Sequence, residues 1–294
     1  MRILLLISHF EILMPDLRDE FRNMIATVND IIEVMESVAP RCFAEDWDNV
    51  GLQVGHGKWP VEKIWVALDP VPEVVNAACR DNADLLITHH PLIFRPLKCV
   101  DLSVWQGLVI RKALESHMAI FAAHTNLDNV KQGINDVLGN MIGLKNLRAL
   151  RKISGLDCHE TGHGTGRTGE LDEPVTLADL ALNIKKKLRL ESVKFAGRAN
   201  LNVSEVAICS GSGSSLLNDF FSSKASVYIS GDLGYHDARS VEVADRGLID
   251  IGHFASEHLM VKVLAQRLEH ILSRSEINVN IHECKIEKEP FASC

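Results

Sequence analysis

Two adjacent histidines end an apolar run in the stretch LLITHHPLIF, residues 85–94. Side chains alternate between the two faces of a strand, and Pro91 disfavours continued strand pairing. The chain is therefore expected to turn here, so that His89 and His90 diverge and serve different neighbours. The two imidazoles could bind metal, or they could be a solvated pair at the start of a loop.

A second polar group follows the next apolar run, where His124 and Asp128 close the stretch FAAHTNLD. In open α/β sheets, ligands bind outside the carboxyl ends of the strands. Two strands that end in such residues therefore favour a common site. Asp128 alone could equally be a turn residue or a helix cap.

A third group lies in IDIGHFASEHL, residues 249–259. His253 and Glu257 are four residues apart, so on a helix they share one face with about 6 Å between their Cβ atoms. That spacing suits a single cation, although an ordinary surface pair would have the same spacing. His258 falls on another face of the helix.

These groups together supply more imidazoles and carboxylates than one catalytic zinc usually takes. The set suits two divalent metals roughly 3.5–4 Å apart, with a bridging water that becomes a hydroxide nucleophile near neutral pH. Mixed imidazole and carboxylate ligation fits zinc, iron, manganese, nickel or cobalt and does not choose among them. The candidates are His89, His90, Asp128, His253 and Glu257, with His124 nearby.

Two glycine-containing stretches are less specific. The backbone amides of ICSGSGSS (208–215) could bind an anion, but a plain tight turn is an equally simple interpretation. The stretch SGDLGYHDA (230–238) could line the same pocket as the histidines, or it could be a capped helix start. Its polar residues are Asp232, Tyr235, His236 and Asp237.

Strand and helix patterns alternate around these groups, which predicts an α/β fold with helices packed on a sheet. In the first half we expect strands at 63–69, 83–91 and 119–128, and helices at 26–38, 71–82 and 103–118. The glycine-rich stretch 158–174 is expected to be a hairpin, a loop or a connection between lobes. A second α/β run begins near residue 175, with strands at 204–210, 225–230, 248–252 and 277–284, and helices at 176–188, 216–222, 238–247 and 253–272.

Composition excludes several classes of protein. The chain has 294 residues and a formal net charge of -8, which argues against a general nucleic-acid binder. Its seven cysteines are odd in number and never in CxxC spacing, so thiols in a reducing compartment are expected. No apolar stretch is long enough to span a membrane. Residues 1–23 are expected to be an extension that is neither a signal peptide nor a transit peptide. It is expected either to be disordered or to precede a true start at Met14 or Met24.

Six motifs occur in an order that resembles the NIF3 family, also called NIF3-like or DUF34: WDNVGLQVG, ITHHPLIF, AAHTNLD, ICSGSG, SGDLGYHDA and GHFASE. The resemblance spans about residues 25 to 290. It implies an α/β fold of two lobes with a dinuclear metal site in the cleft between them, and a toroidal homohexamer. The expected domain is 24–294, with lobes at about 24–145 plus the C-terminal helix and about 175–250, and with no inserted domain.

The resemblance also implies roles for particular residues. The family's ligands fall on His89 and His90, on Asp128, and on His253 and Glu257. His124 and His236 match further polar positions near the metals. Many relatives are named GTP cyclohydrolase 1 type 2 homologues, which implies a hydrolase that opens the purine ring of GTP with a metal-bridging hydroxide. Glu257 or His236 would then move protons.

Two other functions stay open at this point. The chain could be a non-catalytic regulatory or scaffold protein that interacts with transcription factors, as the name of eukaryotic relatives suggests. It could also be a metal-dependent phosphoesterase with the same metal pair. For the enzyme, a small-molecule substrate such as a nucleotide is expected, without direct nucleic-acid or membrane binding. The expected location is the cytoplasm, with a nuclear or mitochondrial pool as an alternative.

Overall fold

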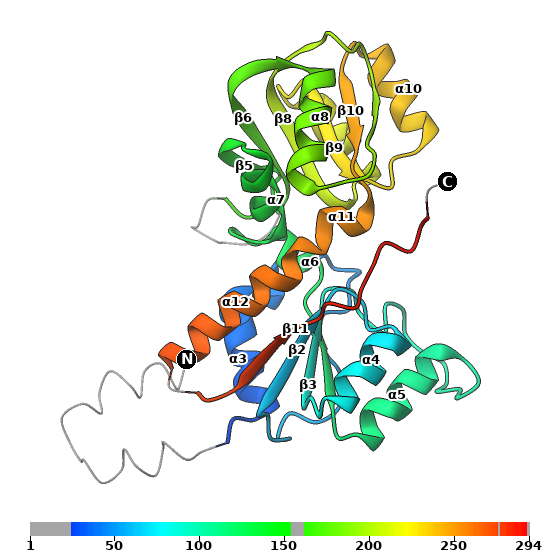
Figure 1. Cartoon of the computed structure of the whole chain (residues 1–294), viewed down its shortest axis with the longest axis vertical. Helices are drawn as coiled ribbons and strands as arrows, with labels where there is room; N and C mark the ends of the chain where they lie inside the picture. The colour runs from blue at the N-terminus through cyan, green and yellow to red at the C-terminus, as the bar shows by residue number, and fades with distance from the viewer. Residues whose placement is uncertain (1–24, 154–161, 276, 293–294) are drawn as a thin grey trace, which may run out of the picture. The chain divides into compact units, whose positions relative to one another are not determined.

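A computed structural model of the chain describes residues 25–153, 162–275 and 277–292. The expected extension at 1–23 lies outside the described residues. The chain is a mixed α/β protein with two sheets and divides into two compact units, whose elements are labelled in Figure 1. The first unit takes the chain up to residue 38 with 49–123 and 262–285, and the second takes 39–48, 124–261 and 286–294.

The first unit contains a five-stranded sheet in which only β1 runs antiparallel to its neighbour. Its order is β1 (Gly51–Val54), β4 (Ala119–Ala122), β3 (Leu85–Thr88), β2 (Lys63–Ala67) and β11 (Asn280–Glu283). The residues of β3 and β4 are all buried, as expected for parallel strands that are covered on both faces.

Helices connect these parallel strands. In Figure 1, α4 (Pro72–Arg80) and α5 (Trp105–Glu115) lie together on one side of the sheet, and α3 (Val28–Val38) lies on the other. Residues 262–274 of α12 (Leu259–Arg274) also belong to this unit. The alternation of strand and helix confirms the α/β pattern predicted for this half of the chain.

The register of the parallel strands decides which side chains meet. Ala67, Thr88 and Ala122 are aligned across β2, β3 and β4. The ladder continues one residue further, because the backbone N–H of His89 donates to Ala67 and that of Ala123 donates to Thr88. The residues that follow the three strands therefore emerge at the same edge of the sheet.

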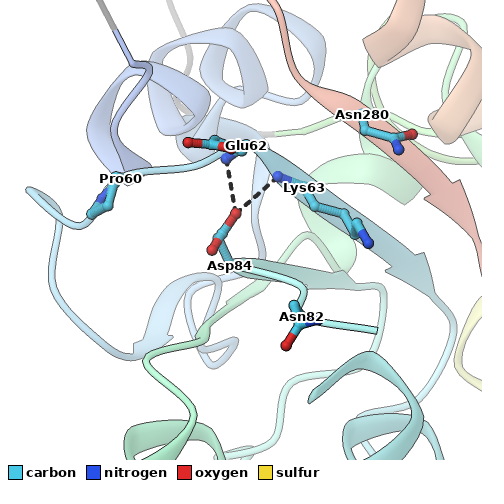
Figure 2. Close-up of a pocket in the computed structure, with 6 residues that line it drawn as sticks. All are labelled: Pro60, Glu62, Lys63, Asn82, Asp84 and Asn280. Atoms are coloured by element: carbon cyan, nitrogen blue, oxygen red, sulfur yellow. Dashed lines mark hydrogen bonds between the residues drawn. The ribbon is translucent and has the colours of Figure 1, made fainter. Parts of the chain in front are cut away.

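A surface hollow lies at the opposite, amino ends of these strands (Figure 2). Within it, the Asp84 carboxylate accepts hydrogen bonds from the backbone N–H groups of Glu62 and Lys63. Asp84 thus anchors the start of β2. Pro60, Asn82 and Asn280 complete the lining.

The second unit contains a six-stranded sheet with a parallel centre, β8–β9–β10, and antiparallel strands on both sides. Its order is β5 (Lys145–Arg151), β6 (Thr165–Thr176), β8 (Asn202–Ser212), β9 (Val227–Gly231), β10 (Gly247–Asp250) and β7 (Lys194–Ala196). The glycine-rich stretch 158–174, as far as it is described, is therefore largely strand β6, the second arm of a hairpin with β5. The sequence patterns did not predict β5 or β7.

Alternating side chains of this sheet form two cores. Ile208 and Ile229 pack with α7 (Ile134–Ile142) and α8 (Leu177–Leu188). On the other face, Ala207 and Tyr228 pack with α9 (Leu217–Ser222) and α10 (Tyr235–Val243). This period of two explains why β8 and β9 read as continuous apolar runs.

Two predicted elements differ in kind from the structure. Residues 119–128 were expected to be a strand running into a loop; the strand ends at Ala122, and the short helix α6 (Thr125–Asn129) follows in place of the loop, so Asp128 is helical. The single helix expected over 253–272 is divided into α11 (His253–Glu257) and α12. None of the described helices is long and apolar enough to cross a membrane.

A buried arginine in the second unit donates hydrogen bonds to residues of several neighbouring segments. Arg167 on β6 is 1% exposed and donates to the Asp136 carboxylate from Nε at 2.9 Å and Nη2 at 2.6 Å. Its other hydrogen bonds reach the carbonyl oxygens of Val130, Gly164 and Gly166. A buried charge is tolerated where, as here, every donor has an acceptor.

Candidate metal centre

In the first unit, His89 and His90 follow β3 with their ring centroids 5.1 Å apart. His89 is fully buried and its Nδ1 lies 2.9 Å from the carbonyl oxygen of Ala123. His90 is partly exposed and its Nδ1 lies 2.7 Å from Oδ1 of Asp69. The two imidazoles thus diverge toward different neighbours, as the strand-end argument predicts.

These contacts define which nitrogen carries the proton. A carbonyl or carboxylate oxygen only accepts, so Nδ1 donates its N–H in both histidines. A neutral imidazole then has its lone pair on Nε2. This is the state in which histidines bind metals, with the other nitrogen held by a hydrogen bond.

In the second unit, His253 and Glu257 are the first and last residues of α11. Nε2 of His253 lies 2.8 Å from Oε2 of Glu257, as the four-residue spacing predicts. Glu257 is only 4% exposed. On the other side of the ring, Nδ1 of His253 lies 2.7 Å from Oδ2 of Asp232.

Carboxylates on both nitrogens of one imidazole require a positive charge between them. If Nδ1 donates to Asp232, a neutral His253 turns its Nε2 lone pair toward an oxygen of Glu257. Two electron pairs 2.8 Å apart repel, so either a second proton or a metal ion must lie there. This electrostatic demand shows that the donor set fits a cation.

Asp128 is oriented by the end of β8. Ser210 donates its hydroxyl to Oδ1 of Asp128 at 3.2 Å. Asn135 accepts from the backbone N–H of Ser210 at 2.8 Å and donates to the backbone carbonyl of Asp128 at 3.2 Å. The ICSGSG stretch therefore positions a carboxylate through its side chains and backbone, a role that its glycine pattern did not suggest.

Glycines allow the close approach of β8 and α11. Gly211 has φ +63°, and a Cβ at this position would overlap the carboxylate of Glu257. The backbone N–H of Gly211 donates to Ser256 Oγ at 2.8 Å, and that hydroxyl donates to the carbonyl of His253. Strand end and helix are thereby joined next to the His253–Glu257 pair.

His124 is held by a buried aspartate. Its Nδ1 lies 2.9 Å from Oδ1 of Asp48, whose other oxygen accepts from the backbone N–H and hydroxyl of Thr125. Burial alone raises the pKa of Asp48, but the hydrogen bond and charge of His124 and the hydrogen bonds from Thr125 outweigh it. The pKa of Asp48 falls to about 2.

The acidic groups also affect Cys209, which is buried under the end of β8. Burial raises the pKa of its thiol, and the negative charges of Asp128 and Glu257 raise it further. This thiol stays protonated at neutral pH and is a poor nucleophile. The cysteines in the described ranges carry no disulfide bond, and Cys284 is the other buried one.

The polar residues of the SGDLGYHDA stretch have different roles. Asp237 caps α10, because its Oδ2 accepts from the backbone N–H of Gly234 at 2.8 Å. Asp232 instead contacts His253. His236 is exposed on α10, and its ring lies edge-on to that of Tyr235.

The residues of types that could hold a metal ion are His89 and His90 in the first unit, and His124, Asp128, His253 and Glu257 in the second. Imidazole nitrogens and carboxylate oxygens suit divalent transition metals. The sequence patterns missed the supporting roles of Asp48 and Asp69. Their positions in the sequence could have indicated these roles, because Asp69 follows the end of β2 and Asp48 lies in the WDN motif.

Comparison with known proteins gives consistent matches over nearly the whole chain. A sequence model of the family described as Duf34/NIF3 (NGG1p interacting factor 3) matches residues 26–290. A relative from Clostridium acetobutylicum is 31% identical over 275 residues, covering 91% of this chain and 99% of the relative. One from Clostridium perfringens is 34% identical over 264 residues, covering 90% and 98%. Both are named GTP cyclohydrolase 1 type 2 homolog.

Solved structures show the same fold. A Staphylococcus aureus protein matches with a TM-score of 0.85 at 29% identity, covering 92% of this chain and 100% of the other. A Bacillus cereus protein related to NIF3 also matches with a TM-score of 0.85, at 24% identity and 92% coverage of this chain. The second likeness supports the fold alone.

Proposed function

Because the chain belongs to the Duf34/NIF3 family, we propose that it binds two divalent metal ions and uses them in a hydrolytic reaction. The proposed ligands are His89, His90, Asp128, His253 and Glu257, with His124 beside them. The donor set suits zinc, iron, manganese, nickel or cobalt.

The observation that carries this proposal is the placement of His253 between two carboxylates. Asp232 engages Nδ1 at 2.7 Å and Glu257 lies 2.8 Å from Nε2. The Glu257 side chain is only 5% exposed, so water screens its charge weakly. A metal ion supplies the required positive charge without protonating the imidazole.

Hydrolysis adds water across the bond that breaks, so a base must take a proton from water and an acid must return one to the leaving atom. Divalent ions held by such ligands lower the pKa of a bound water toward neutrality. Glu257, buried next to His253, is the proposed proton acceptor. His236, exposed on α10, is proposed as the group that exchanges protons with solvent.

The proposed substrate is a nucleotide, and GTP is the first candidate. The support is the name GTP cyclohydrolase 1 type 2 homolog, which both clostridial relatives carry. Ring opening of the purine breaks a carbon–nitrogen bond, which is compatible with the acid–base pair proposed above. A phosphoester is the alternative substrate of the same site.

We also propose that the chain assembles as a homohexamer in the cytoplasm. The segment 94–108 exposes seven large apolar side chains by 39–56%: Phe94, Leu97, Val100, Leu102, Val104, Trp105 and Leu108. Contiguous apolar surface of this kind is typical of protein interfaces. The described cysteines, all without disulfide bonds, suit a reducing compartment.

The test is metal content and turnover of the purified chain. We expect two metals per chain after reconstitution, and turnover of GTP or of a phosphoester. His90→Ala and Glu257→Ala should lose metal and turnover, whereas His270→Ala, an exposed histidine on α12, should lose neither. Less than one metal per chain would exclude the dinuclear site. Two metals without turnover on any substrate would favour the regulatory or scaffold function.

A further inference from the structure

Asp232 has an unusual backbone conformation at the end of β9. Its φ of 53° lies in the left-handed region, which side chains other than glycine adopt rarely. The residue before it, Gly231, approaches α11 so closely that a Cβ there would meet the backbone N of His253 at 2.5 Å. The strained residue therefore lies where the strand end reaches the start of α11.

In this backbone conformation, the side chain of Asp232 contacts His253. Its Oδ2 lies 2.7 Å from Nδ1, the length of a charge-assisted hydrogen bond. Backbone strain at a residue whose side chain contacts a candidate site is a reason to suspect a functional role. The alternative is an ordinary surface ion pair.

The same arrangement occurs at two other histidines. Asp69 engages Nδ1 of His90 at 2.7 Å, and Asp48 engages Nδ1 of His124 at 2.9 Å. In all three pairs the aspartate lies at Nδ1, and at His253 a second carboxylate, that of Glu257, lies at Nε2. A chance surface pair has no reason to select the same nitrogen three times.

We propose that Asp232 is a positioning residue: it holds His253 with the proton on Nδ1 and so presents Nε2 as the metal-binding atom. This inference rests on the proposed metal-binding function. Without the carboxylate, the ring could rotate or carry its proton on Nε2. Either change would remove a lone pair from the metal-binding direction.

The chain offers a matched control in Asp245. It has φ 55°, is exposed, and pairs with Arg198 at the surface. Asp232→Gly and Asp245→Gly both remove a carboxylate at a position where glycine relieves strain, so both variants should fold. Asp232→Asn keeps an acceptor for Nδ1–H and tolerates the left-handed conformation, which makes it the conservative variant.

The first measurement is zinc affinity, by competition with a chromogenic chelator. We expect Asp232→Gly to lose about 10–100-fold in affinity and Asp232→Asn to lose less. Asp245→Gly should bind like the unmodified chain. Equal affinity of Asp232→Gly and Asp245→Gly would overturn the proposal.

The second measurement needs no metal. In the metal-free chain at alkaline pH, ¹⁵N chemical shifts of His253 should show the Nδ1–H tautomer, and Asp232→Gly should shift the population toward Nε2–H. A dominant Nε2–H tautomer in the unmodified chain would overturn the inference. If the unmodified chain binds none of zinc, iron, manganese, nickel and cobalt while His253 shows the Nδ1–H tautomer, the proposed function fails and the positioning role of Asp232 on the ring stands.

Discussion

At the scale of single residues, the candidate metal centre depends on hydrogen bonds that orient imidazoles and carboxylates. His89 is held by a backbone carbonyl, and His90, His124 and His253 are held by aspartates. Such partners fix the tautomer of a histidine before any metal arrives. Gly211 and Gly231 then provide the space in which α11 approaches the ends of β8 and β9.

Gly211 gives the first prediction at this scale. Alanine at this position would displace the Glu257 carboxylate and adopt an unfavourable left-handed conformation. We expect Gly211→Ala to weaken zinc binding at least about tenfold, as for other changes in ligand support. Gly234→Ala is the control, since its Cβ would meet only Asp237 Oδ2 at 3.6 Å. Equal zinc affinity of the two variants, measured by titration calorimetry, would refute the argument.

Thiol chemistry gives a second prediction. Because burial and nearby carboxylates raise the pKa of Cys209, its thiolate is scarce at pH values where ordinary thiols react. In the native chain at about pH 8, we expect iodoacetamide to modify the partly exposed Cys79, which lies outside segment 94–108, and to leave Cys209 intact. Peptide mapping by mass spectrometry reads both sites. In denaturant both should react, and early labelling of native Cys209 would contradict its described burial.

Many of the candidate ligand residues can be predicted from sequence, but the residues that orient them cannot. Strand ends and an i, i+4 spacing are local patterns, and they identified His89, His90 and the His253–Glu257 pair as candidates. The partners Asp69 and Asp48 are 21 and 76 residues away from their histidines. Such contacts depend on strand register and loop path, which spacing does not encode.

At the scale of elements, the difference between local sequence patterns and contacts between distant residues explains which strands were predicted. The buried strands β2, β3, β8 and β9 are apolar runs with little ambiguity. Strand β5 has the sequence KNLRALR and none of its residues is fully buried, so it lacks that signal. Strand β6 begins in a glycine-rich stretch, and its pairing with β5 and β8 overrides the weak strand propensity of glycine.

Arg167 on β6 gives a prediction about this sheet. Arg167→Met would leave the Asp136 carboxylate and three backbone carbonyls without their donor in a buried place. We expect a loss of about 3–5 kcal/mol in the free energy of unfolding. Arg198→Met, which removes only a surface pair with Asp245, should cost less than about 1 kcal/mol. Urea denaturation monitored by circular dichroism compares them, and similar costs would show that the Arg167 network contributes little.

At the scale of the whole molecule, the first unit exposes the apolar segment 94–108, whereas the exposed apolar residues of the second unit, among them Val243 on α10, are spread over several elements. Single exposed apolar residues are common, whereas a run of them marks an interface. We therefore expect substitutions in segment 94–108 to change the assembly of the chain, and a substitution of Val243 to leave it unchanged.

Val100→Glu combined with Leu102→Glu should dissociate the proposed hexamer, because each change places a charge in a buried interface. Val243→Glu should leave the assembly intact. Light scattering coupled to size-exclusion chromatography gives the mass of each. A monomeric unmodified chain, or a double variant with unchanged mass, would show that segment 94–108 is no subunit interface.

The backbone acceptor of His89 has a consequence for mutational tolerance. A single base change can remove the carboxylate of Asp69, Asp48 or Asp232, but no substitution deletes the carbonyl oxygen of Ala123. The orientation of His89 therefore does not depend on the identity of another side chain, because its acceptor is a backbone carbonyl. The other three histidines each depend on one aspartate side chain that a substitution can remove. Loss of one of these aspartates would leave its histidine without a partner at Nδ1, whereas His89 would keep its orientation after the same changes.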